Sequence, residues 1–137
     1  LSNDLTHSWL YQQLKQRKRM MKPLLMDQRF IAGLGNIYVD EVLWQAKIHP
    51  RAISITIGKV RCIKLCHSIK EILSSAIKYK GTTIIDYSYG SNEKGRFKKE
   101  LKVFGRINKP CLRCSMSITK IFVSQRGTYY CKKCQPV

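Results

Sequence analysis

Apolar residues recur every three or four positions over much of the first 80 residues, a spacing that predicts amphipathic helices. One helix is predicted over residues 6–19. A second, short helix opens near Pro23, whose fixed φ suits a first helical turn. Gly33-Leu34-Gly35 then interrupts the pattern, and Asn36 is the predicted N-cap of a third helix over residues 37–46.

A longer helix is predicted over residues 57–80, with Gly81 as its C-cap. Its inward face is expected to hold these apolar residues: Val60, Ile63, Ile69, Ile72, Leu73, Ala76 and Ile77. Cys62 and Cys66 lie one turn apart on the same helix. We expect them to be reduced and half-buried, and a second metal site that includes His67 is the alternative.

A different pattern follows in the last 30 residues. β-branched and aromatic residues lie on both sides of a short polar stretch that contains Gly127. This is typical of a β-hairpin, and it places Arg126 at the hairpin tip. A guanidinium there suits a phosphate clamp or insertion into a nucleic-acid groove, but a solvated arginine in an ordinary turn fits the pattern equally well.

Two C-x-x-C pairs flank this hairpin. They are Cys111 with Cys114 and Cys131 with Cys134, and sixteen residues separate the pairs. This spacing predicts a structural zinc site, because four thiolates complete a tetrahedron around one ion and leave no open position for catalysis. Two disulfides, or four unrelated thiols, are the alternative.

The net charge of the chain indicates the class of partner that it binds. There are 26 Lys and Arg residues against 8 Asp and Glu, a formal net charge of +18. Such a field predicts a polyanionic partner. Nucleic acid is favoured over a membrane, because the sequence shows neither a signal peptide nor a long apolar stretch. The zinc spacing and the lack of a signal together indicate a reducing cytoplasm.

The Gly33-Leu34-Gly35-Asn36 turn is a candidate phosphate site. Glycines let a ligand approach the backbone closely, and the start of the next helix presents free N–H groups. A connection between helices that needs glycine only for its geometry is the alternative.

Six motifs occur in a fixed order along the chain: Lys22-Pro23-Leu24-Leu25-Met26-Asp27-Gln28, Ala32-Gly33-Leu34-Gly35-Asn36-Ile37-Tyr38-Val39-Asp40-Glu41, His49-Pro50, Gly81-Thr82-Thr83-Ile84, Lys102-Val103-Phe104-Gly105-Arg106 and Gln125-Arg126-Gly127-Thr128-Tyr129-Tyr130-Cys131. In this order they resemble the formamidopyrimidine-DNA glycosylases over essentially the whole chain. The resemblance implies a mainly α fold, with a helix–two-turns–helix domain over residues 1–103 and a β-hairpin zinc finger with four cysteine ligands over residues 104–137.

The same resemblance implies roles for individual residues. Lys22 and Asn36 would contact phosphates that flank a lesion, and Arg126 would enter the duplex or hold a flanking phosphate. Residues 86–95 would form the loop that closes over an extruded base. The implied partner is double-stranded DNA with oxidised or abasic lesions, bound by a monomer in the bacterial cytoplasm at the nucleoid.

One departure from the family pattern concerns catalysis. The family's nucleophile is an N-terminal proline followed by glutamate, whereas this chain begins Leu1-Ser2. We therefore expect the damaged-DNA-binding C-terminal part of a base-excision glycosylase and AP lyase for 8-oxoguanine and formamidopyrimidine, with no catalytic residue of its own and its catalytic N-terminal domain absent. Phe104 also stands where many relatives have tyrosine. The alternative is a zinc-ribbon protein that binds RNA or the ribosome and has no enzymatic activity.

Overall fold

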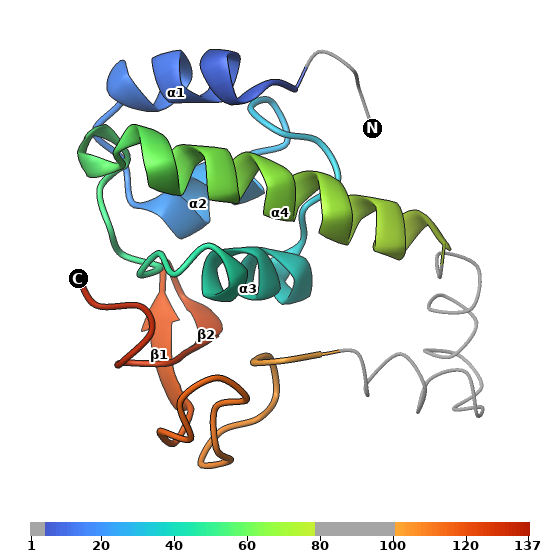
Figure 1. The fold of residues 1–137 in the computed structure, drawn as a ribbon, viewed down its shortest axis with the longest axis vertical. Coiled ribbons are helices and arrows are strands. Elements are labelled where there is room, and N and C mark those ends of the chain that lie inside the picture. Colours follow the sequence, from blue (N-terminus) through green and yellow to red (C-terminus); the bar gives the residue numbers. More distant parts are fainter. Residues whose placement is uncertain (1–4, 79–100) are drawn as a thin grey trace.

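The computed structural model describes residues 5–78 and 101–137, without the side chains of residues 75–78. The predicted loop over residues 86–95 and the predicted cap Gly81 lie outside the described residues, as do the side chains of Ala76 and Ile77. In the described part, a group of helices lies on one side of a two-stranded hairpin (Figure 1).

The four predicted helices are present, with shifted ends. They are α1 (His7–Lys15), α2 (Met21–Met26), α3 (Asn36–Gln45) and α4 (Lys59–Lys78), and a short 3-10 helix, η1 (Ser54–Thr56), precedes α4.

The first two helices differ from their predicted ends because of contacts that the sequence pattern does not show. α1 begins after Thr6, whose Oγ1 accepts a hydrogen bond from Trp9 N at 3.1 Å. It ends at Lys15 rather than at residue 19, because the following segment is drawn into extended contacts: Arg19 N donates to Ser54 Oγ at 3.2 Å. α2 begins two residues before Pro23.

The helical face of α4 differs from the prediction at its start. Val60 is 68% exposed and Ile63 is 48% exposed, although both were expected to face inward. Ile69 and Leu73 are buried as expected, and Cys62, Leu65 and Cys66 are buried in place of Val60 and Ile63. The two cysteines are therefore fully buried, not half-buried, and desolvation raises the pKa of Cys62 to about 11.

The hairpin consists of β1 (Thr119–Val123) and β2 (Arg126–Tyr130), paired antiparallel with Val123 opposite Arg126. Ser124 and Gln125 form the turn, with φ of 48° and 67°. Two consecutive residues with positive φ make the type of tight turn whose twist matches that of a hairpin. Arg126 thus begins β2 next to the turn, whereas we expected it at the tip.

Two hydrophobic clusters stabilise these parts. The larger is built from α1, α2, α3, α4 and the connections between them. The smaller contains Val103, Cys111, Ile118 and Cys131 together with Trp44, which comes from α3. The expected domain boundary after residue 103 stays a prediction. No described helix combines the length and the apolar character that crossing a bilayer requires.

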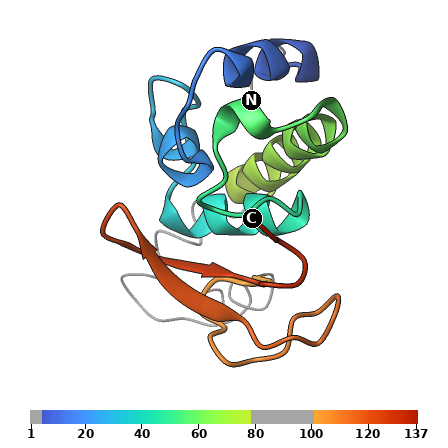
Figure 2. The ribbon, with the colours of Figure 1, turned by 90° about the vertical axis from the view of Figure 1, so that its left-hand side faces the viewer.

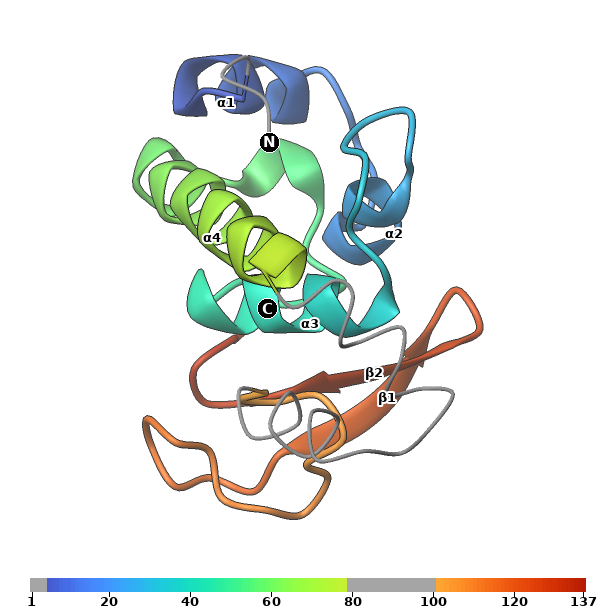
Figure 3. The same ribbon diagram turned by 90° about the vertical axis from the view of Figure 1, so that its right-hand side faces the viewer.

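The hairpin crosses beneath α3, and its turn extends toward α2 (Figures 2 and 3). The connection that ends in Asn36, the start of α3 and the hairpin turn therefore come together. This junction contains the residues that the sequence singled out.

Candidate nucleic-acid interface and metal centre

The four cysteines of the two C-x-x-C pairs form a compact group. Their sulfur atoms all lie within 4.8 Å of one another, with 3.8 Å between Cys111 and Cys134 and 3.4 Å between Cys114 and Cys131. Zinc–sulfur bonds of about 2.3 Å in a tetrahedron place sulfurs about 3.8 Å apart, whereas a disulfide needs about 2.05 Å. The four residues therefore fit one structural zinc ion, and the disulfide alternative does not fit.

Hydrogen bonds to sulfur favour ionisation of Cys111, whereas desolvation raises the pKa of Cys131 and that of Cys134. Arg113 N and the indole Nε1 of Trp44 both donate to Cys111 Sγ at 3.4 Å. Burial opposes ionisation of Cys111, but the hydrogen bonds from Arg113 N, Cys114 N and Trp44 outweigh it and lower its pKa to about 6. A thiolate is the form that binds a metal ion, so these donors favour metal binding.

The alternative second metal site is not assembled. Among the described residues, the four cysteines of the zinc site are the one group of three or more possible ligands that converge. His67 is exposed and lies 3.2 Å from Glu71 on its own helix. The thiol of Cys62 donates instead to the carbonyl of His7 at 3.7 Å.

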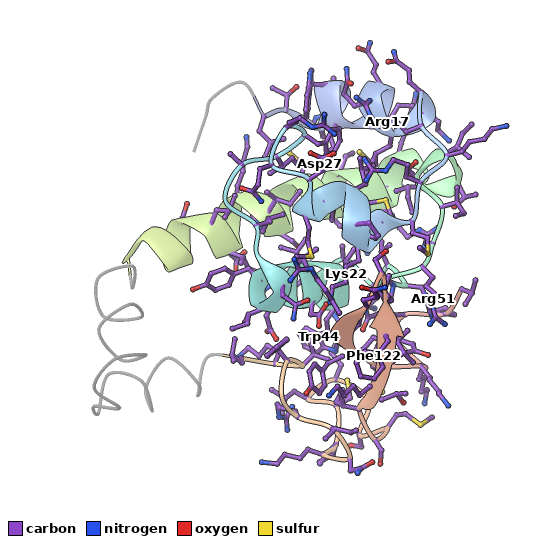
Figure 4. The ribbon with its side chains drawn as sticks, turned by 180° about the vertical axis from the view of Figure 1, so that it is seen from behind. Arg17, Lys22, Asp27, Trp44, Arg51 and Phe122 are labelled. Atoms are coloured by element: carbon purple, nitrogen blue, oxygen red, sulfur yellow. The ribbon has the colours of Figure 1, made fainter. Side chains whose placement is uncertain are left out.

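Lys22 and Asp40 form a buried ion pair at the junction between the helices and the hairpin. Lys22 Nζ lies 2.9 Å from Asp40 Oδ1, and the two side chains are 1% and 0% exposed. The same ammonium donates to Gly127 O at 3.1 Å and to Thr128 Oγ1 at 2.7 Å. Asp40 Oδ2 accepts from Tyr129 N at 2.9 Å. Lys22 thus joins α2 to α3 and to β2 (Figure 4).

Burial acts on both charges of this pair. Desolvation lowers the pKa of Lys22, although the charge of Asp40 opposes the shift. Desolvation likewise raises the pKa of Asp40 to about 6, against the attraction of Lys22 and the hydrogen bond from Tyr129. Removing both charges from water costs free energy, and the mutual attraction and hydrogen bonds of the pair offset this cost, as expected for a buried ion pair.

Asn36 lies beside this pair but does not cap its helix. It is the first residue of α3, and Gly35 occupies the N-cap position, so the predicted N-cap role is wrong. Its Nδ2 donates to Gly127 O at 3.3 Å, while its buried Oδ1 has no hydrogen-bond partner among the described residues. The amide thereby links the start of α3, where backbone N–H groups are free, to the hairpin.

Glu41 holds the chain where it enters the zinc finger. Its carboxylate accepts three backbone N–H groups, from Lys102 at 2.7 Å, Val103 at 2.9 Å and Phe104 at 2.8 Å. Desolvation raises the pKa of Glu41, and these three hydrogen bonds oppose the shift. Two adjacent acidic residues of α3 therefore bind different segments. Asp40 binds strand β2, and Glu41 binds residues 102–104, which lead into the zinc finger.

A cavity of about 330 Å³ lies between α2 and the hairpin turn. Its charged lining residues are Arg19, Lys22, Asp27, Arg29 and Arg126, four cations and one carboxylate. Asp27 pairs with Arg19 at 3.2 Å and with Arg29 at 3.3 Å. Hydrogen bonds from Arg29 and then from Arg19 lower the pKa of Asp27 to about 2. The excess of positive charge makes this hollow suitable for an anion such as a phosphate.

Comparison with known families identifies this arrangement. The family model described as the formamidopyrimidine-DNA glycosylase H2TH domain matches residues 1–88. The chain belongs to the formamidopyrimidine-DNA glycosylase family. A second family model, described as a zinc finger found in FPG and IleRS, matches residues 108–137. The predicted helix–two-turns–helix (H2TH) domain, the four-cysteine zinc finger and its single structural zinc ion are thus confirmed.

Individual relatives are similar to this protein over nearly its whole length. Formamidopyrimidine-DNA glycosylase of Pediococcus pentosaceus is 49% identical over 96% of this chain. A Lactococcus lactis Fpg crystallised with abasic-site DNA superimposes with a TM-score of 0.87, at 39% identity over 100% of this chain. The Lactococcus lactis Fpg crystallised with Fapy-dG DNA superimposes with a TM-score of 0.85, at 39% identity over 97% of this chain. The chain spans about half the length of each relative, 48%, 49% and 48%.

The sequence predicted some residues of this site and missed others. It singled out Lys22, Asn36 and Arg126, and the structure brings all three to the junction around Gly127 and the cavity. It missed Asp40 and Trp44. The signal for Asp40 was its position four residues after Asn36, which places both on the same face of α3.

Proposed function

We propose that this chain binds double-stranded DNA at oxidised or abasic lesions, and that it grips the phosphate backbone with the junction between α3 and the hairpin. The observation that carries the proposal is the shared use of Gly127 O. Lys22 Nζ and Asn36 Nδ2 both donate to this carbonyl, so the start of α3 and the residue after Arg126 are held together.

Each of the three residues has a separate part in this proposal. Arg126 is exposed beside the cavity and offers a guanidinium to a phosphate. Asn36 offers its second amide hydrogen together with the free N–H groups of the first turn of α3. Lys22 borders the same cavity, but Asp40 neutralises its enclosed ammonium. Its part is to hold Gly127, and thereby to position Arg126. The lesion class follows the DNA present in the crystallised relatives.

The binding test compares duplex affinity among matched variants. We expect Arg126→Ala and Asn36→Ala to weaken binding to an abasic-site duplex about tenfold or more, since a hydrogen bond to a charged group contributes roughly 1.5–3 kcal/mol. Arg126→Ala should also reduce the slope of log K against log salt by about one. Fluorescence anisotropy at several salt concentrations measures both quantities. The control, Lys64→Ala, removes an exposed cation from α4.

The outcomes separate DNA binding from the alternative. Equal affinity of Arg126→Ala, Asn36→Ala and Lys64→Ala would contradict the proposed grip. Preference for a structured RNA over the abasic duplex at fixed salt would instead favour the zinc-ribbon RNA-binding function. A binding constant that does not change with salt would contradict any role for phosphate contacts.

We also propose that catalysis belongs to the half of the family's enzymes that this sequence does not contain. The expected result is that borohydride traps no covalent adduct between residues 1–137 and an 8-oxoguanine duplex, because the N-terminal proline amine of the family pattern is not in this sequence. A crystallised relative's full-length enzyme serves as the positive control. Efficient trapping with residues 1–137 alone would overturn this proposal.

We further propose that the chain acts as a monomer at the bacterial nucleoid.

A further inference from the structure

We propose that Trp44 is an outer ligand of the zinc site, whose indole N–H binds the Cys111 thiolate and thereby couples zinc affinity to helix α3. This inference rests on the zinc site and does not depend on DNA binding. It starts from one contact: Trp44 Nε1 lies 3.4 Å from Cys111 Sγ, and the tryptophan is only 6% exposed.

The chemistry of the indole makes this contact directional. Its N–H group donates and cannot accept, and a buried indole N–H normally has a partner. In the structure that partner is a zinc ligand. A sulfur that carries thiolate charge is a better acceptor than a neutral thiol, so this hydrogen bond stabilises the thiolate, which is the form that binds a metal ion. Loss of the donor should therefore weaken metal binding.

The position of Trp44 distinguishes it from the other donors to sulfur. Arg113 N and Cys134 N donate to sulfur from within the two C-x-x-C turns. Trp44 belongs to α3 of the H2TH domain, outside the zinc finger (Figure 4). It therefore makes the zinc site sensitive to the docking of one module on the other.

Arg113 fixes the indole in this position. Its guanidinium carbon lies 3.7 Å from the centre of the Trp44 ring, and its NH2 group donates to the carbonyl of Trp44. Arg113 also lies between the two cysteines of the first C-x-x-C pair. The ring is thus held between the end of α3 and the first C-x-x-C turn, so its N–H direction is set by packing as well as by the hydrogen bond.

Trp44→Phe tests the proposal in the complete chain of residues 1–137, because phenylalanine retains an aromatic ring and loses the N–H. We expect zinc affinity, measured by competition with a chromophoric chelator, to fall about tenfold or more. With Co²⁺ in place of zinc, the thiolate-to-cobalt charge-transfer band should move to lower energy, since a thiolate without its donor is more easily oxidised. The control, Trp9→Phe, changes a tryptophan that stacks on Phe30 at 5.6 Å between ring centres, away from the zinc site.

A second measurement uses the unmodified side chain of Trp44, so it does not depend on the folding of Trp44→Phe. In the Trp9→Phe protein a single indole N–H signal remains, and with ¹¹³Cd in the site we expect a scalar coupling between the metal and this proton through the sulfur. A coupling would support the hydrogen bond directly. Unchanged zinc affinity and an unchanged cobalt band in folded Trp44→Phe would overturn the proposal, as would an indole proton with no coupling to cadmium.

Discussion

Cys131→Ser should unfold the zinc finger, reduce DNA binding to a weak and nonspecific level, and leave most of the helical circular dichroism. The reason is the small size of the second hydrophobic cluster, in which two of the zinc ligands, Cys111 and Cys131, are themselves core residues. Binding of a structural zinc ion supplies roughly 10–16 kcal/mol in comparable small modules. Without it, so few apolar residues cannot offset the conformational entropy of the hairpin.

Three measurements on one preparation check this result: zinc content, far-UV circular dichroism and anisotropy with an abasic-site duplex. Cys62→Ala is the matched control, because it removes a buried cysteine of α4 and leaves the zinc site intact. It should retain one zinc ion per chain and full DNA affinity. Full DNA affinity in Cys131→Ser after verified loss of zinc would contradict a role for the metal in binding. Loss of a zinc ion from Cys62→Ala would support the alternative metal site that includes Cys62, Cys66 and His67.

Lys22→Met should destabilise the protein by about 3–5 kcal/mol at neutral pH, the range found when one partner of a buried ion pair is removed. The cause is Asp40, which would remain fully enclosed without its cation. Lys22→Met/Asp40→Leu removes both charges and should recover most of the loss. Urea unfolding followed by fluorescence measures the difference, and Lys64→Met controls for loss of an exposed lysine.

The effect of Lys22→Met should depend on pH with a definite sign. Burial already raises the pKa of Asp40 to about 6 in the presence of Lys22, and loss of the lysine raises it further. A raised pKa means that the folded state binds the proton more tightly than the unfolded state. The variant should therefore be most stable near pH 4 and lose stability as the pH rises toward 7. A deficit that grows as the pH falls would contradict this assignment of the ion pair.

The zinc site and the phosphate-site candidates could be predicted from sequence because their signals are local. A C-x-x-C turn brings its two thiols together whatever surrounds it, and two such turns at the ends of one hairpin meet as the strands pair. In the same way, Gly33-Leu34-Gly35-Asn36 defines a helix start within a few residues. The capping role of Asn36 was wrong, since Gly35 takes that position, and its predicted phosphate contact stays a prediction.

The buried charges could not be predicted in this way, because their partners are distant in sequence. Asp40 binds Tyr129 and Glu41 binds Val103, separations of 89 and 62 residues. Periodicity ordinarily assigns acidic residues to the solvent, so it carries no signal that these two carboxylates are buried. The error at the start of α4 has a related cause, because Val60 and Ile63 fit helical spacing as well as Cys62 and Leu65 do. Packing against α1 and α3 decides between these two faces.

The contacts around β2 also protect the hairpin from association with other molecules. A two-stranded sheet has two open edges, and each is a template for an added strand. On β2 the outward carbonyl of Gly127 and the outward N–H of Tyr129 are occupied by Lys22 and Asp40. On β1, Arg51 donates to Phe122 O at 2.8 Å. The groups that bind the zinc finger to the helices thus also reduce the edge available for aggregation beside the exposed ring of Phe122.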